Sequence, residues 1–168
     1  MKLQSVLLSG AGALLLAMAA ATSAVADELP QRKAGLWEIK MTHAKGAQGS
    51  PARQCTDASF EKEAGVFADQ MMTCSKRDIR KTAAGYTVDS ECKIMGMTTT
   101  SRTEITGDFN SAYKMKQTAR TQGGIAGKAG QDSDMMIEGK WLGPCPAGWK
   151  PGDMEVDGKR MSLKEIMQ

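Results

Sequence analysis

Residues 76–94 of this 168-residue chain read KRDIRKTAAGYTVDSECKI, and they indicate the fold more clearly than any other stretch. Over 86–94 every second side chain is apolar or small, which is the period-two pattern of a half-buried strand. The small residues at 83–85 separate this strand from another over 76–81. Two strands joined by so short a turn predict an antiparallel hairpin.

The same alternation recurs on both sides of the hairpin. Trp37, Ile39 and Met41 alternate with polar residues, and the threonine-rich stretches that follow the hairpin have high β propensity. Glycines at 123, 124, 127 and 130 mark a loop between the last two predicted strands. Outside the hairpin, strands are expected over 35–42, 97–106, 112–121 and 135–142.

One amphipathic helix is expected between the first strand and the hairpin. Asp57 is a good N-cap residue, and it precedes apolar residues spaced to share one helical face. Gly65 in the middle costs about 1 kcal/mol relative to alanine, so this helix needs a sheet to pack on. The residues of the apolar face are Phe60, Ala64, Phe67, Ala68 and Met71.

The C-terminal part predicts a pinned loop. Residues 143–153 contain three prolines and three glycines, which exclude a helix or a central strand. Ser162 and Glu165 have the spacing of a capping box that could open one terminal turn. Together these elements predict an α+β fold: a curved, half-barrel-like antiparallel sheet of about six to seven strands with one helix.

Residues 1–26 have the features of a bacterial secretory signal. Lys2 is followed by a short apolar stretch, and the small residues Ala24 and Ala26 satisfy an A-x-A cleavage rule. We therefore expect a single periplasmic β-rich domain over 27–168, without a transmembrane segment because the apolar core is too short to span a bilayer.

The four cysteines all follow the predicted cleavage site. An even number of cysteines in an exported chain favours two disulfides, and three pairings are possible. Zinc is the alternative, but the sequence has no C-x-x-C motif and only one histidine, so we expect no metal and no cofactor. The cysteines are Cys55, Cys74, Cys92 and Cys145.

The hairpin predicts one of the two pairs. Cys74 and Cys92 flank it, but matching Ile79 with Val88 places Ser75 opposite Cys92. A β-bulge must absorb this offset of one residue if Cys74 pairs with Cys92.

Cys55 and Cys145 then form the other pair, which ties the start of the helix to the proline-rich loop. This bond closes a loop of about 90 residues, which the chain-entropy model equates with about 4–5 kcal/mol of stability.

The charges give no sign of a nucleic-acid partner. The formal net charge is +3, and the basic residues are interspersed with acidic ones. A nucleic-acid-binding face would cluster them, so we expect no such partner. The scattered basic residues include Arg32, Lys33, Lys76, Arg77, Arg80, Lys81 and Arg120.

No catalytic residues are predicted, and no enzyme activity is expected. His43 has no second histidine and no evident serine or cysteine partner for a triad. Met95 and Met97 could form a soft copper site with His43, but thioethers more often fill gaps in a core.

The three tryptophans are the candidate binding residues. One helix cannot cover every strand of such a sheet, so the face carrying Trp37 and Trp141 could stay accessible, with Trp149 at its edge. Core packing of the aromatic rings is the competing interpretation, and burial of these side chains would remove the site.

The stretch 32–39 (RKAGLWEI) after a signal peptide, the motif GPCP at 143–146 and the spaced cysteine pair between them resemble a bacterial exported family, domain of unknown function 3617. The family often has proline where this chain has Ala34. The resemblance implies a periplasmic, disulfide-containing, β-rich protein, and it supplies no catalytic residues.

Two functions remain open at this point. The favoured one is a non-enzymatic module that binds an apolar envelope molecule or a protein partner on the sheet. The alternative is a metal-handling or hydrolase-like envelope protein, whose activity would be lost on His43→Ala.

Overall fold

The computed structural model describes residues 28–123 and 130–167. Within these ranges, nine strands form one sheet in the order β3-β4-β5-β6-β7-β1-β2-β8-β9, and every neighbouring pair is antiparallel. The antiparallel sheet is as predicted, whereas the expected six to seven strands are too few. The strands are β1 (Gly35–His43), β2 (Ala52–Thr56), β3 (Thr73–Thr82), β4 (Gly85–Ile94), β5 (Met97–Gly107), β6 (Ala112–Gly123), β7 (Gln131–Gly143), β8 (Asp153–Val156) and β9 (Lys159–Ser162).

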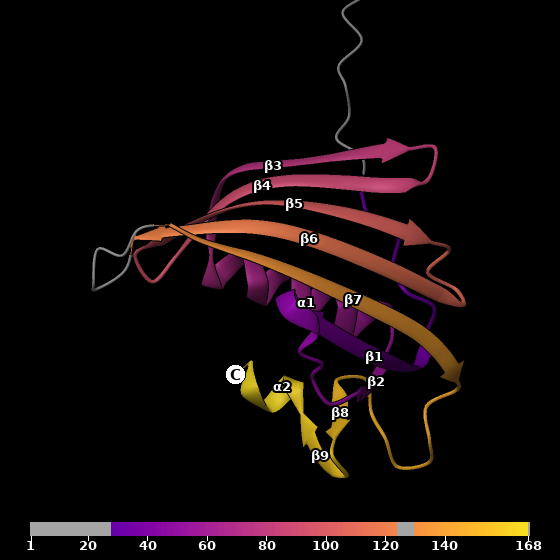
Figure 1. Ribbon diagram of the computed structural model, residues 1–168. Coiled ribbons are helices and arrows are strands. Elements are labelled where there is room, and N and C mark those ends of the chain that lie inside the picture. Colours follow the sequence, from indigo (N-terminus) through magenta and orange to yellow (C-terminus); the bar gives the residue numbers. More distant parts are fainter. Residues whose placement is uncertain (1–27, 124–129, 168) are drawn as a thin grey trace, which may run out of the picture.

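The sheet is open and bends around the long helix α1 (Ala58–Met71), which lies on its concave side (Figure 1). A short second helix, α2 (Leu163–Ile166), ends the chain beside β8 and β9, and one turn of 3-10 helix, η1 (Ala44–Gly46), follows β1. The predicted signal over 1–26 and part of the predicted glycine-rich loop lie outside the described residues.

The hairpin of β3 and β4 confirms the register predicted from the sequence. Ile79 pairs with Val88, and the register shifts between Cys74 and Lys76 so that Cys74 faces Cys92. These two cysteines form a disulfide with their Cα atoms 3.9 Å apart. The bulge therefore brings the two cysteines into direct opposition.

The second disulfide, Cys55–Cys145, also forms as predicted and joins β2 to the loop after β7. In the same region the backbone N–H of Gly152 donates to the Cys55 carbonyl at 2.9 Å. The proline-rich segment is thus fixed to β2 at two points, as expected for a pinned loop.

α1 begins where the sequence indicates. The Asp57 side chain accepts a hydrogen bond from the Phe60 backbone N–H at 2.8 Å, which caps the helix. Phe60 is buried, and its ring lies against Gly152, where a Cβ would be 3.1 Å from two ring carbons. This end of α1 therefore packs against the C-terminal part of the protein.

The core lies between the sheet and the segment that precedes β1. Trp37 is fully buried, and its ring centroid is 5.5 Å from that of Tyr113, which in turn stacks on Phe109. Gly139 makes this packing possible, because a Cβ there would lie within 2.8 Å of three ring carbons of Tyr113. Ile105 completes the buried cluster.

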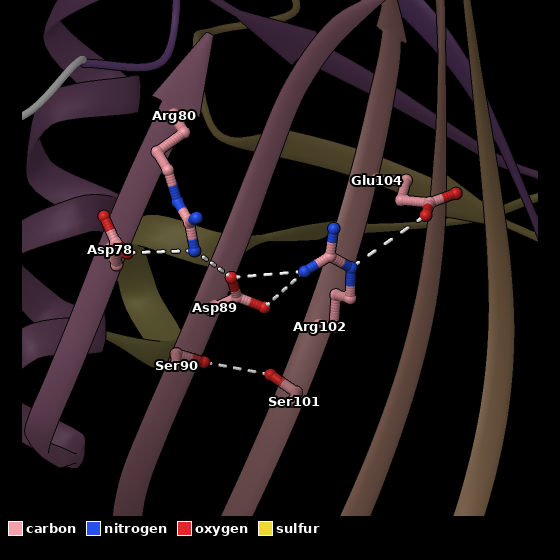
Figure 2. Close-up of polar contacts among 7 residues, drawn as sticks. All are labelled: Asp78, Arg80, Asp89, Ser90, Ser101, Arg102 and Glu104. Atoms are coloured by element: carbon pink, nitrogen blue, oxygen red, sulfur yellow. Dashed lines mark hydrogen bonds and ion pairs between the residues drawn. The ribbon is translucent and has the colours of Figure 1, made fainter. Parts of the chain in front are cut away.

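The opposite, convex face carries charges of alternating sign. Asp89 on β4 pairs with Arg80 on β3 at 2.6 Å and with Arg102 on β5 at 3.1 Å (Figure 2). Asp78 and Glu104 extend this row at 3.0 and 4.0 Å. Such exposed pairs contribute little stability each, but they keep the outer face of the sheet polar.

Three strands were not predicted. β2 lies between the first predicted strand and the N-cap of the predicted helix, where no element was assigned, and β8 and β9 follow the proline-rich segment. The predicted turn at the C-terminus exists as α2, although the Ser162 side chain makes no capping hydrogen bond. The described residues contain no helix long and apolar enough to cross a membrane.

Candidate functional site

The structure removes Trp37 from the predicted binding surface. The side chain is 0% exposed, and its indole N–H donates to the Lys33 carbonyl at 2.8 Å. The register does place Trp141 beside it on the neighbouring strand. The competing interpretation, core packing, therefore holds for Trp37, because the side chain has no surface for a ligand.

Trp141 and Trp149 are half-buried, and each has a cation over its ring. Lys33 Nζ lies 3.7 Å from the Trp141 ring centroid, and the indole N–H of Trp141 donates to the Ala34 carbonyl at 3.1 Å. The guanidinium carbon of Arg160 lies 5.7 Å from the Trp149 ring centroid. The tryptophans thus do not form one aromatic patch. Trp149 lies in the loop before β8 and has Arg160 of β9 over its ring, whereas Trp141 lies on β7.

An opening with apolar walls lies between α1 and the concave face of the sheet. This helix cavity has a volume of about 610 Å³. Gly65 faces it from α1, and a Cβ at this position would have no atom within 4 Å. The apolar side chains of its wall are Leu29, Ile39, Met41, Phe109, Met115 and Ile137.

A second opening continues along strands β4 to β6. This strand cavity has a volume of about 410 Å³ and shares Leu29 and Met115 with the helix cavity. Val88, Ile105 and Met72 supply more apolar surface. Its remaining wall is rich in hydroxyl and amide side chains: Ser90, Thr99, Ser101, Thr103 and Gln117.

A half-buried polar cluster borders the helix cavity where α1 begins. Arg32 donates from Nε to Glu61 Oε1 at 2.9 Å and from Nη2 to Gln54 Oε1 at 3.0 Å. The Thr56 hydroxyl donates to the same Glu61 oxygen at 2.6 Å. The cluster therefore joins the segment before β1, strand β2 and the first turn of α1.

Tyr113 lies next to this cluster. Burial raises the pKa of the Tyr113 hydroxyl, while the positive charge of Arg32 and a hydrogen bond to it act in the opposite direction. The phenol therefore stays protonated at neutral pH and presents a neutral polar group at the edge of an apolar cavity.

The structure does not bring the proposed copper ligands together. His43 ends β1, whereas Met97 begins β5, and strands β6 and β7 lie between them in the sheet. Among residues 28–123 and 130–167, no group of three or more His, Cys, Asp or Glu side chains is placed to hold a metal ion.

Sequence reasoning missed both cavities and the cluster. The residues of the cluster come from three segments that no local pattern connects. Two signals were present, however: a glycine in the middle of an amphipathic helix, and serines and threonines at strand positions that alternation assigns to the inner face. Both features mean that small side chains, or none, face the space between α1 and the strands.

Residues 32–145 match the protein family described as "Protein of unknown function (DUF3617)". No curated protein and no solved structure matched the chain. The matched range begins at Arg32 of the polar cluster and ends at Cys145 of the second disulfide, so it includes α1 and the whole concave face of β3 to β7. This chain therefore belongs to the DUF3617 family.

Proposed function

We propose that this protein is an exported, non-enzymatic binding protein that holds an apolar molecule of the envelope between α1 and the sheet. The observation that carries the proposal is the space opposite Gly65, where a helix stands over an apolar strand surface without filling it. Gly65 and Met41 are exposed, so this space is a groove open to solvent. A groove with apolar walls beside a buried core is a typical place for a ligand to bind.

The dimensions and composition of the two cavities support a small-molecule ligand. Ligand sites have volumes of roughly 300–1,000 Å³ and combine apolar walls with a few polar groups. Each of the two cavities lies within this range. A folded protein partner is less favoured, because the wall of the helix cavity is made by α1 and the sheet together, so the space lies between two elements and not on one flat face.

Export is supported by the signal-like sequence over 1–26 and by the two disulfides. Disulfides persist in oxidising compartments, and such a compartment would give the protein access to lipids and other apolar components of the envelope. No contact within the described residues favours the metal-handling or hydrolase-like alternative.

The test uses two substitutions at Gly65. Gly65→Leu places a branched apolar side chain in the helix cavity, and Gly65→Ala adds one methyl group at the same position. Both replacements favour the helix by up to about 1 kcal/mol, so neither is expected to unfold α1. The three proteins are isolated from the periplasm under native conditions and analysed by native mass spectrometry.

We expect the parent and Gly65→Ala to carry a bound apolar molecule and Gly65→Leu to have lost most of it. A parent that remains ligand-free after incubation with envelope lipid extract would contradict the proposal. Equal retention by Gly65→Leu would contradict it as well, because the molecule would then bind elsewhere.

A further inference from the structure

We infer that the ligand is a single-chain amphiphile, whose hydrocarbon chain lies below Gly65 in the helix cavity and whose uncharged, hydroxyl-bearing head group lies at the far end of the strand cavity. This inference rests on the proposed function and adds the chemical class and the orientation of the ligand.

The shape of the space favours a long, thin molecule. The two cavities share Leu29 and Met115 in their walls, so they lie next to each other along the concave face, and we infer that one ligand runs through both. From Ile105 to Thr99, which both line the strand cavity, the rise of β5 covers roughly 20 Å. Methionines at 41, 72 and 115 line the two cavities, and their flexible side chains adapt to a chain without a fixed shape.

α1 is held most firmly where it begins, so this end does not easily lift to admit a broad ligand. Arg32 pairs with Glu61 in its first turn, and Arg77 on β3 pairs with Asp69 near its last turn at 2.9 Å. The Cys74–Cys92 disulfide follows directly after the helix. A rigid ring system would need a wider opening beside the Arg32–Glu61 pair than a chain does.

The polarity of the sheet changes along the two cavities, and this change orients the ligand. Met115 pairs with the buried Ile105 in an apolar row below α1. Farther along the strands Ser90 and Ser101 face each other with their hydroxyl oxygens 2.9 Å apart (Figure 2). Thr99 forms a similar pair with Thr121 in the next row.

These hydroxyl pairs retain hydrogen-bonding capacity. Within each pair one hydroxyl donates to the other, so the second hydroxyl keeps a proton to donate and both oxygens keep acceptor capacity. The polar groups of the helix cavity differ, because Arg32, Glu61 and Gln54 already bind one another. The head group therefore belongs at the hydroxyl rows.

The charge at this end favours an uncharged head group. Among the described residues that line the strand cavity, Arg77 is the one with a charge, and its guanidinium is paired with Asp69. Hydroxyl groups on a glycerol-like head complement serine and threonine hydroxyls without displacing this ion pair.

The test locates the chain by its proximity to Trp37, which is itself buried but lies with its ring centroid 5.5 Å from that of Tyr113, a residue in the wall of the helix cavity. Long-chain monoacylglycerols brominated either next to the head group or near the chain end are added to a Trp141→Phe/Trp149→Phe protein. Bromine quenches indole emission only at short range, so the probe with the terminal bromine should quench more strongly. Stronger quenching by the head-proximal bromine would overturn the orientation.

The head group is tested by affinity. Ser101→Ala should weaken binding of monoacylglycerol by roughly two- to tenfold, the size expected for one hydrogen bond, and should leave binding of a headless long-chain hydrocarbon unchanged. Ser133→Ala is the matched control, since Ser133 continues the same row through Ala119 but lies outside the strand cavity. Equal effects of the two variants would overturn the head-group assignment.

Three further probes separate the possible outcomes. Tighter binding of a fatty acid or a lysophospholipid than of the monoacylglycerol would overturn the uncharged head group, and tight binding of a rigid sterol would overturn the single chain. Each of these results leaves the proposed function standing. Failure of all apolar probes to bind would overturn the proposed function itself.

Discussion

Arg32 links three parts of the molecule through one side chain, so replacing it should lower the free energy of unfolding. Its guanidinium is only 14% exposed and contacts Glu61 and Gln54. Replacing it by methionine keeps the apolar stem but removes the positive charge from the half-buried Glu61 carboxylate, which keeps its hydrogen bond from the Thr56 hydroxyl. Hydrogen bonds to charged groups contribute about 1.5–3 kcal/mol.

We therefore expect Arg32→Met to lower the free energy of unfolding by about 2 kcal/mol in urea denaturation. Arg120→Met is the matched control, because the Arg120–Asp132 pair is more than half exposed on both sides. It should change the free energy by less than about 0.5 kcal/mol. Similar losses in both variants would show that the Arg32 cluster does not hold α1 in place.

Asp108 gives a prediction on pH. Its carboxylate accepts hydrogen bonds from the backbone N–H groups of Ser111 and Asn110 and from the Ser111 hydroxyl, and these bonds lower its pKa from 3.8 to about 2. A lowered pKa stabilises the folded state above the unfolded value, and this contribution is lost as pH falls from about 4 to about 2.

The carboxyl signal of Asp108 in an NMR titration should therefore have its midpoint near pH 2. Asp108→Asn keeps an oxygen acceptor and removes the charge. The parent should be more stable than this variant at about pH 5, and the difference should vanish as the pH approaches the folded pKa. A midpoint near the ordinary value would mean that these hydrogen bonds do not persist in solution.

At the scale of elements, the two disulfides should differ in their effects. Their sequence separations are 90 residues for Cys55–Cys145 and 18 residues for Cys74–Cys92. The chain-entropy model gives about 4.5 kcal/mol for the longer loop and about 3 kcal/mol for the shorter one.

Replacing both cysteines of a pair by alanine should therefore cost more stability for Cys55/Cys145 than for Cys74/Cys92. Urea denaturation of the two double variants measures the difference, and non-reducing peptide mapping of the parent checks the pairing. A larger loss for the Cys74/Cys92 variant would mean that the bulged hairpin depends on its disulfide for local structure.

The same hairpin shows which features of the structure can be predicted from the sequence alone. Alternation from Tyr86 to Ile94 was enough to predict the pairing of Ile79 with Val88, the bulge and the disulfide, because all of these are consequences of a local register. The capping of α1 by Asp57 was equally local. Elements whose partners are near in sequence were therefore predicted well.

β2, β8 and β9 were missed for the opposite reason. β8 and β9 have only four residues each, and β2 has five, so none is long enough for a clear alternation. Distance adds to this for β2 and β8, which pair across about a hundred residues, whereas β9 pairs with the adjacent β8 and was missed only because both strands are short. The helix cavity is lined by side chains from the segment before β1, from α1 and from several strands, so no single local pattern outlines it.

At the scale of the whole molecule, the two faces of the sheet have different roles. The convex face is covered with paired charges such as Asp89 with Arg102, whereas the concave face is apolar near Trp37 and hydroxyl-rich toward Thr99. A single helix covers part of the concave face and leaves the remainder open. This asymmetry makes the concave side the place where a ligand would reduce exposed apolar area.

The compartment in which the protein resides determines which ligands are available to it, so export needs a direct test. We expect cleavage after Ala26, so that the mature chain begins Asp27-Glu28-Leu29-Pro30 and retains Leu29 in the wall of both cavities. N-terminal sequencing of protein from the periplasmic fraction reads this directly. Ala24→Leu puts a bulky residue at the small-residue position and should block processing, whereas Ala24→Ser should be processed like the parent. An intact N-terminus in the membrane fraction of the parent would refute export by a cleavable signal, and the search for a ligand would then move away from the envelope.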